Sequence, residues 1–281
     1  RQMCIRDRDK NVIKSLIIEY QQFVDKITLI ERDIHLSNQL NYVFVGLRRA
    51  GKSYLMYQQI QHLLKEGHQI EEMLYFNFED DRLINLTIED LDLIKVCYEE
   101  LYAHRPILFL DEIQIVEHWE KFARRLADQK YRVYITGSNA KMLSSEIATT
   151  LGGRFIIQNV YPFSFQEYLK ANNIIVEPVW YFKNRTEIVR AFSAYFYFGG
   201  LPELELIKEI EKRQWLSGLF NKIFFGDLIT RYSIRNDLAM KVLIRKLAES
   251  VKQPSSFNRL SNIISSTGVR VTTDTIIDYL E

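Results

Sequence analysis

The chain has 281 residues, of which 47% are hydrophobic and 13% aromatic, and its formal net charge is +1 at pH 7. This is the composition of a globular protein with enough length for one large core or two smaller ones. A net charge this small excludes a strong overall electrostatic attraction to nucleic acid or membranes. The sequence shows neither an apolar run long enough to span a bilayer nor a signal-peptide pattern. We therefore expect a cytoplasmic protein with no membrane partner.

The first eight residues, RQMCIRDR, look foreign to the rest of the chain. They do not begin with methionine, and QMCIRDR is what a transposase-end sequencing adapter encodes in one reading frame. We therefore predict that residues 1–8 are translated adapter, and we leave them out of the reasoning on the fold. Without Cys4, Cys97 is the single cysteine, which excludes a disulfide, and its helical context predicts a buried side chain.

The next part of the chain alternates between helical and strand patterns. Residues 10–31 carry apolar side chains three to four positions apart, which predicts a helix. Short apolar runs typical of strands alternate with helical patterns in this part of the chain. This alternation predicts an α/β fold, with a mostly parallel sheet that helices cover on both faces. The apolar runs of strand type are 41–46, 73–80, 106–112, 131–138 and 154–163, and the helical patterns between them include 53–67, 88–103 and 118–129.

From about residue 164 the pattern changes to helical segments rich in aromatic residues. The last part, residues 239–281, predicts three short helices joined by turns. Three helices of this kind resemble a winged-helix or helix-turn-helix unit. We therefore expect an all-helical region after the sheet.

The segment GLRRAGKS, residues 46–53, fits the pattern G-x-x-x-x-G-K-[ST] between a predicted strand and a predicted helix. Its glycines let the backbone bend around a phosphate chain, and the helix N-terminus adds positive potential. Lys52 would reach the β- and γ-phosphates, and Ser53 would ligate Mg²⁺. A tight turn with a solvated lysine is the alternative. The predicted nucleotide-binding residues are Gly46, Leu47, Arg48, Arg49, Ala50, Gly51, Lys52, Ser53 and Tyr54.

A second motif, ILFLDEIQ at residues 107–114, is an apolar strand that ends in two carboxylates. Asp111 at a strand end can hold Mg²⁺ through water, and Glu112 can polarise an attacking water as general base. By itself, such a pair is most simply a solvated strand end. Beside a phosphate loop, the pair favours a catalytic interpretation and argues against the bare turn.

These motifs, in this order, resemble an AAA+ ATPase of the bacterial and archaeal group that carries a C-terminal domain of unknown function. GLRRAGKSYL resembles that group's Walker A, ILFLDEIQ its Walker B, and ITGSNAKMLSSEIATTLGGRF its sensor-1 strand, following helix and Gly-Arg. NVYPFSFQEYL and FGGLPEL also match. The resemblance implies a nucleotide-binding domain with an N-terminal helix over 9–163, a helical lid or linker over 164–238, and a truncated winged-helix-like unit over 239–281.

The resemblance also implies roles for single residues. A polar residue on the sensor-1 strand positions the water, and Ser138 and Asn139 both remain open for this role. Arg154 occupies the place of the arginine finger, which implies a homo-oligomer; a salt-bridged surface arginine is the alternative. We interpret Arg48 and Arg49 as solvated cations that attract ATP, in preference to a contact with a neighbouring subunit or with nucleic acid.

The leading hypothesis is an enzyme: Mg²⁺-dependent ATP hydrolysis that drives a conformational change in a partner or substrate. The alternative is a slowly hydrolysing, ATP-gated switch whose C-terminal helices contact DNA or protein. The acidic TTDTIIDYLE weighs against direct reading of DNA, and Glu112 argues against a vestigial site. The group usually continues past the point where this chain stops, at Glu281, so we expect a fragment from a metagenomic assembly.

Overall fold

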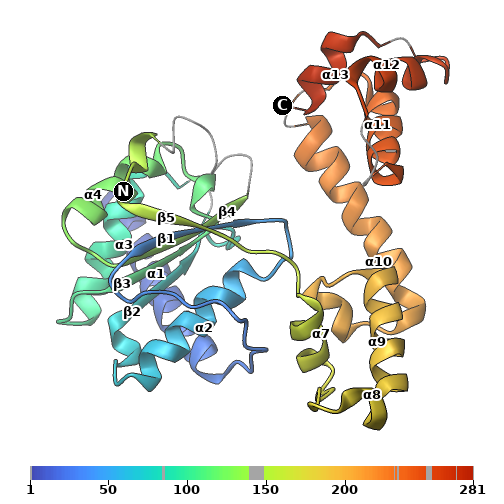
Figure 1. Cartoon of the computed structure of the whole chain (residues 1–281). Helices are drawn as coiled ribbons and strands as arrows, with labels where there is room; N and C mark the ends of the chain where they lie inside the picture. Colours follow the sequence, from blue (N-terminus) through green and yellow to red (C-terminus); the bar gives the residue numbers. More distant parts are fainter. Residues whose placement is uncertain are drawn as a thin grey trace. The chain divides into compact units, whose positions relative to one another are not determined.

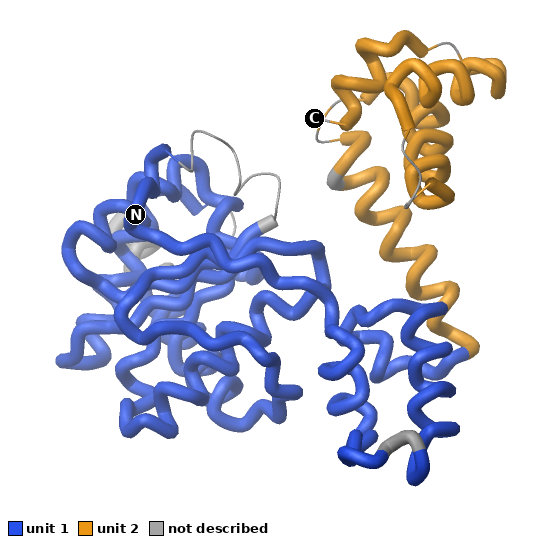
Figure 2. The backbone as a smooth tube through the Cα atoms, in the orientation of Figure 1, with its two compact units in different colours: residues 1–209 blue, residues 210–281 orange. Residues whose placement is uncertain are grey.

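The computed structural model describes residues 2–83, 86–138, 149–230, 232, 234–250, 255–269 and 271–280. The chain divides into two compact units, residues 1–209 and 210–281, which Figure 2 shows in blue and orange. This division differs from the expected boundaries at 163/164 and 238/239, which stay predictions. No helix in the described part of the chain is long and apolar enough to cross a membrane.

The centre of the first unit is a five-stranded sheet in which every neighbouring pair is parallel (Figure 1). The α/β fold and the five strands predicted from the sequence are confirmed, although the second to fifth strands are shorter than predicted. The order across the sheet is β2-β3-β4-β1-β5. The strands are β1 (Asn41–Gly46), β2 (Met73–Asn77), β3 (Ile107–Asp111), β4 (Val133–Ser138) and β5 (Phe155–Asn159).

Helices cover both faces of the sheet, because successive side chains of a strand point to opposite sides. Val43 and Val45 of β1 join the core under α3 (Ile88–Leu101) and α4 (Trp119–Asp128). Tyr42 and Phe44 join the core under α2 (Lys52–Lys65) on the other side. Both cores are built from short apolar strands, as the sequence predicts.

Helix α1 (Gln2–Lys26) lies along the sheet edge formed by β2 and covers it, since Gln21 Nε2 donates to the carbonyl oxygen of Met73 at 2.9 Å. The prediction of a helix over 10–31 is wrong at both ends. The helix already begins at Gln2, within the segment interpreted as adapter. It ends at Lys26, where Gln61 Nε2 of α2 caps the carbonyl oxygens of Val24 and Ile27, at 3.1 and 2.8 Å.

After β5 the first unit continues as helices. A capping box starts α7: Ser164 Oγ accepts from the Glu167 amide at 3.2 Å, and Glu167 Oε2 accepts from the Ser164 amide at 2.8 Å. The helices are α7 (Phe165–Ala171), α8 (Trp180–Lys183) and α9 (Arg185–Phe198). Short 3₁₀ turns in this unit are η1 (Ile70–Glu72), η2 (Ile113–Ile115) and η3 (Pro202–Leu206).

The second unit is helical in its described residues, none of which lies in a strand. Its elements are α10 (Glu209–Lys222), the π-helical segment η4 (Ile223–Thr230), α11 (Asp237–Glu249), α12 (Phe257–Ser265) and α13 (Thr273–Leu280). Phe224, Met240, Leu260 and Ile276 belong to its small core. The three predicted C-terminal helices are confirmed, whereas the winged-helix detail stays a prediction.

Candidate functional site

The phosphate-loop sequence lies at the carboxyl edge of the sheet. Gly46 ends β1 and pairs with Ser138 at the end of β4, while β3 ends close by at Asp111. A side chain on Gly46 is impossible, because its Cβ would lie 2.1 Å from the carbonyl oxygen of Val160. Gly51, with φ of 95°, precedes α2 and adopts a conformation that favours glycine. Both glycines of the motif are therefore required by the backbone.

Lys52 begins α2 and is only 5% exposed. Its Nζ donates to the carbonyl oxygens of Gly46 and Leu47, each at 3.3 Å, and lies 3.7 Å from Glu112 Oε1. The backbone carbonyl groups of the loop thus hold the ammonium group of its own lysine. The two predicted catalytic residues of the separate motifs, Lys52 and Glu112, are brought together.

Asp111 is 2% exposed and accepts hydrogen bonds from the hydroxyls of Tyr75 and Thr136. Burial raises the pKa of this carboxyl, and hydrogen bonds from Thr136, Tyr75 and Ser53 oppose the rise. Ser53 and Asp111, the two predicted Mg²⁺ ligands, are therefore neighbours that offer the oxygen ligands this cation takes. One carboxylate and a hydroxyl fit Mg²⁺, which is usually held by one or two carboxylates together with substrate phosphates.

Glu112 has a left-handed backbone with φ of 55°, a strained conformation of the kind that clusters at functional sites. Its amide donates to Thr136 Oγ1 at 2.9 Å, and its Oε2 accepts from Gln114 Nε2. Thr136 therefore bonds to both carboxylate residues, to the side chain of Asp111 and to the backbone of Glu112. Sequence reasoning missed Thr136 and Tyr75; a polar residue inside the apolar run YRVYITGS was the only signal for Thr136.

The adjacent arginines of the loop each lie against a carboxylate of the same chain. Arg48 Nη1 is 3.8 Å from Glu79 Oε1, and Arg49 forms an ion pair with Glu203 of η3. Both side chains stay accessible to solvent, at 33% and 41% exposed, so their interpretation as cations that attract ATP stays a prediction. The pairing was not visible in the sequence because Arg49 and Glu203 are 154 positions apart.

The remaining residues of the predicted loop differ in exposure. Ala50 is fully buried, whereas Leu47 is 46% and Tyr54 is 53% exposed. Tyr54 packs against the ring of Tyr57, with centroids 5.4 Å apart. The two exposed side chains flank the loop on the surface.

A buried arginine behind the loop was also missed. Arg32 precedes β1, and its guanidinium donates to Glu167 Oε1 at 2.7 Å, to the carbonyl oxygen of Ala50 at 3.1 Å and to that of Tyr161 at 2.8 Å. The backbone of Arg32 exchanges two hydrogen bonds with the side chain of Gln58 on α2. One side chain therefore connects the phosphate loop, the segment after β5 and helix α7.

The two remaining groups of predicted site residues are less well placed for chemistry within this chain. Ser138 closes β4 beside Gly46, but its side chain and all of Asn139 lie outside the described residues, so the choice between them stays open. Arg154 precedes β5 at the amino edge of the sheet, and its Nε lies 2.6 Å from Asp128 Oδ1. Within one chain it is a salt-bridged surface arginine, and a role in a neighbouring subunit stays a prediction.

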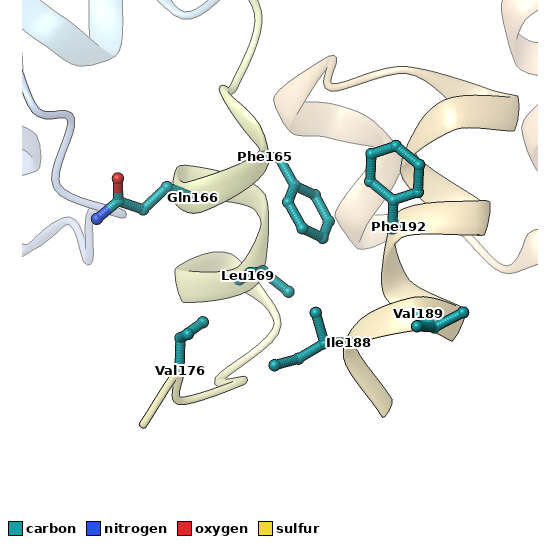
Figure 3. A pocket seen from close by; sticks show the side chains of 7 residues that line it. All are labelled: Phe165, Gln166, Leu169, Val176, Ile188, Val189 and Phe192. Carbon is teal, nitrogen blue, oxygen red and sulfur yellow. The ribbon is translucent and has the colours of Figure 1, made fainter. Parts of the chain in front are cut away.

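An apolar groove of about 430 Å³ lies between α7 and α9, away from these residues (Figure 3). Its lining is Phe165, Gln166, Leu169, Val176, Ile188, Val189 and Phe192. It contains no cation and no backbone cradle for phosphate. The groove therefore does not compete with the carboxyl edge as a nucleotide site.

Residues 38–169 match the family model described as "AAA domain". This stretch of the chain is therefore similar to AAA domains. The match includes both motifs and ends within α7. The resemblance to AAA+ P-loop ATPases inferred from the motifs is thereby confirmed.

Relatives of this chain come from an archaeon and a bacterium. An uncharacterized protein of Methanocaldococcus jannaschii is 33% identical, covering 97% of this chain and 62% of that protein. An uncharacterized protein of Haemophilus influenzae is 31% identical, covering 90% of this chain and 64% of that protein. The chain thus spans less than two thirds of the length of the curated relatives it matches.

Two solved structures are also similar to this chain, at low sequence identity. AMPPCP-bound DnaA from Aquifex aeolicus is 15% identical with a TM-score of 0.36, covering 87% of this chain and 81% of that one. The Orc1 protein of Aeropyrum pernix in complex with DNA is 12% identical with a TM-score of 0.37, covering 98% and 81%. At TM-scores this low the two likenesses carry no argument about function, and the assignment rests on the family match.

Proposed function

We propose that the AAA domain binds ATP with Mg²⁺ and hydrolyses it, and that hydrolysis drives a conformational change in a partner or substrate. The observation that supports this proposal is the meeting of Lys52, Ser53, Asp111 and Glu112 at the carboxyl ends of parallel strands. In open α/β sheets, ligands bind in the crevice outside these ends. The reaction belongs to the cytoplasm, where we place the protein.

Each residue has a proposed role. Residues 46–54 would surround the phosphates, with Lys52 Nζ turned toward the β- and γ-phosphates in place of its present carbonyl partners. Ser53 and Asp111 would hold Mg²⁺, which supplies charge neutralisation on the phosphate oxygens. Glu112 would accept the proton of the attacking water, with Ser138 or Asn139 orienting that water and Arg154 serving a neighbouring subunit.

The experiment that tests hydrolysis separates it from binding. Glu112→Gln removes the base but keeps the shape and the hydrogen bond from Gln114, so ATP affinity should stay within about twofold while turnover falls roughly a hundredfold or more. The matched control is Glu117→Gln, an exposed carboxylate after the same strand, which should hydrolyse ATP normally. Unchanged turnover in Glu112→Gln would remove Glu112 from the mechanism.

A second candidate is an ATP-gated switch that hydrolyses slowly and whose C-terminal helices contact DNA or protein. The engagement of Glu112 by both Gln114 and Lys52 favours it, because a carboxylate held this way is not free to activate water. The two functions differ in a single-turnover measurement with excess protein. An enzyme converts bound ATP at the steady-state rate or faster, whereas a switch releases ATP unchanged.

A further inference from the structure

The tip of the phosphate loop is attached to the 3₁₀ turn η3. Arg49 forms its ion pair with Glu203, and a Cβ on Gly51 would lie 3.8 Å from Cγ of Pro202. The loop and η3 are therefore in contact at two positions just before Lys52, the residue proposed to reach the phosphates. This places a carboxylate, Glu203, against the loop that is proposed to surround the phosphates.

The backbone of Arg49 indicates that its side chain matters. Its φ is 65°, a left-handed conformation that is strained for a non-glycine residue. Glycine would adopt the same conformation without this cost. The side chain that occupies the strained position is the one that reaches η3.

The turn η3 is firmly joined to the helical part of the first unit. Leu204 is fully buried, and the carbonyl oxygen of Gly200 accepts from the Phe163 amide at 2.7 Å. A Cβ on Gly200 would lie 2.3 Å from the carbonyl oxygen of Phe163, so the two segments approach as closely as only glycine allows. A change at Glu203 therefore reaches the segment between β5 and α7.

Two ion pairs connect the loop region to these segments, and they differ in burial. The side chains of Arg32 and Glu167 are 6% and 9% exposed, whereas those of Arg49 and Glu203 are 41% and 40% exposed. A buried pair is costly to break, whereas an exposed pair contributes little to stability. The Arg49–Glu203 pair is therefore the contact that a polyanion can replace.

We propose that Glu203 is an affinity-determining residue of the nucleotide site, because it competes with the phosphate chain for the Arg49 guanidinium. Nucleotide binding draws Arg49 from Glu203 and loosens η3. The coupling is reciprocal: if ATP weakens the ion pair, then removal of the ion pair strengthens ATP binding by the same factor. This inference rests on the proposed ATP binding.

The test is a double-mutant cycle in which ATP dissociation constants are measured by calorimetry. Glu203→Gln should bind ATP about twofold to fivefold more tightly than the unmodified protein, the range set by an exposed ion pair. In an Arg49→Gly background, which keeps the loop conformation accessible, adding Glu203→Gln should change nothing. The control Glu187→Gln, an exposed carboxylate on α9, should bind as the unmodified protein does.

Hydrogen exchange gives an independent measure of η3. The Leu204 amide bonds to the Leu201 carbonyl oxygen at 3.0 Å and the Ile207 amide to the Leu204 carbonyl oxygen at 3.4 Å. ATP should speed exchange of these two amides in the unmodified protein and leave it unchanged in Arg49→Gly.

Each other outcome overturns the inference in a distinguishable way. Weaker ATP binding in Glu203→Gln would mean that Glu203 supports the loop. Equal binding, or an equal gain in the Arg49→Gly background, would mean that no competition for Arg49 exists. If the unmodified protein itself binds no ATP, the proposed function fails and this inference fails with it.

Discussion

The carboxyl and amino ends of the strands form two edges of the sheet, and the polar residues of these edges differ in how deeply they are buried. At the carboxyl edge Lys52, Asp111 and Thr136 are almost inaccessible to solvent, and Glu112 has a left-handed backbone. At the amino edge Arg154 and Asp128 form an ion pair on the surface, where the Arg154 guanidinium lowers the pKa of the Asp128 carboxyl. Burying charged groups costs free energy, whereas an ion pair on the surface does not have this cost. The buried charges at the carboxyl edge therefore indicate that these residues have a role other than stabilising the fold.

The strongest challenge to this contrast is a role for the amino edge in a neighbouring subunit. An arginine supplied in trans increases phosphoryl-transfer rates on the order of 10³ or more. If Arg154 acts in this way, Arg154→Ala and Glu112→Gln should each be inactive and regain activity when mixed, because each supplies what the other lacks. Specific activity of the unmodified protein should also rise with protein concentration.

The readout for Arg154 is the hydrolysis rate across a dilution series and in the mixture, with folding of both variants checked by circular dichroism. Flat specific activity and an inactive mixture would reject the finger. The amino edge would then be structural, and the contrast between the two edges would be complete.

The second prediction concerns the buried Arg32–Glu167 pair behind the loop. Burial raises the pKa of Glu167, but hydrogen bonds from Arg32 and from the Ser164 amide outweigh burial, and the net pKa is lowered. Because the folded-state pKa lies below the unfolded value, the pair stabilises the fold above the unfolded pKa. This stability is lost as pH falls through the folded pKa.

Glu167→Gln should therefore cost about 3–5 kcal/mol of unfolding free energy near neutral pH, since it leaves a buried guanidinium without its partner charge. The measurement is urea unfolding between neutral pH and pH 3, where the difference between variant and unmodified protein should shrink. Arg125→Gln is the control, because its ion pair with Asp92 is half exposed. A constant difference across this range would show that the charge of Glu167 contributes nothing.

The third prediction concerns Tyr75, which holds Asp111 from the neighbouring strand. Tyr75→Phe removes a hydrogen bond to a proposed Mg²⁺ ligand, and loss of such a partner lowers metal affinity by about 10–100-fold. The measurement is the Mg²⁺ concentration that half-saturates ATP binding. Tyr134→Phe is the matched control, because it loses a buried hydrogen bond to Gln59 and none to Asp111. Equal effects in both variants would assign Tyr75 to packing alone.

The parts of the site that the sequence predicts are those set by local chain order. The strand 41–46, the loop that follows it and the Asp111-Glu112 pair could be placed because each motif lies within a few residues. Arg32, Tyr75 and Thr136 could not be placed, since their bonds join residues that are 135, 36 and 25 positions apart. The end of α1 was missed for the same reason, because the side chain that caps its last carbonyl groups, Gln61, comes from another helix.

The proposed function requires that the carboxyl edge of the sheet binds ATP through the phosphate loop. Calorimetric titration of Lys52→Ala with Mg²⁺-ATP tests it most directly, with Lys65→Ala, an exposed lysine at the end of the same helix, as the control. We expect ATP binding in the unmodified protein and in Lys65→Ala. In Lys52→Ala we expect no ATP binding that calorimetry can detect. Equal ATP affinity in Lys52→Ala would contradict the proposed function.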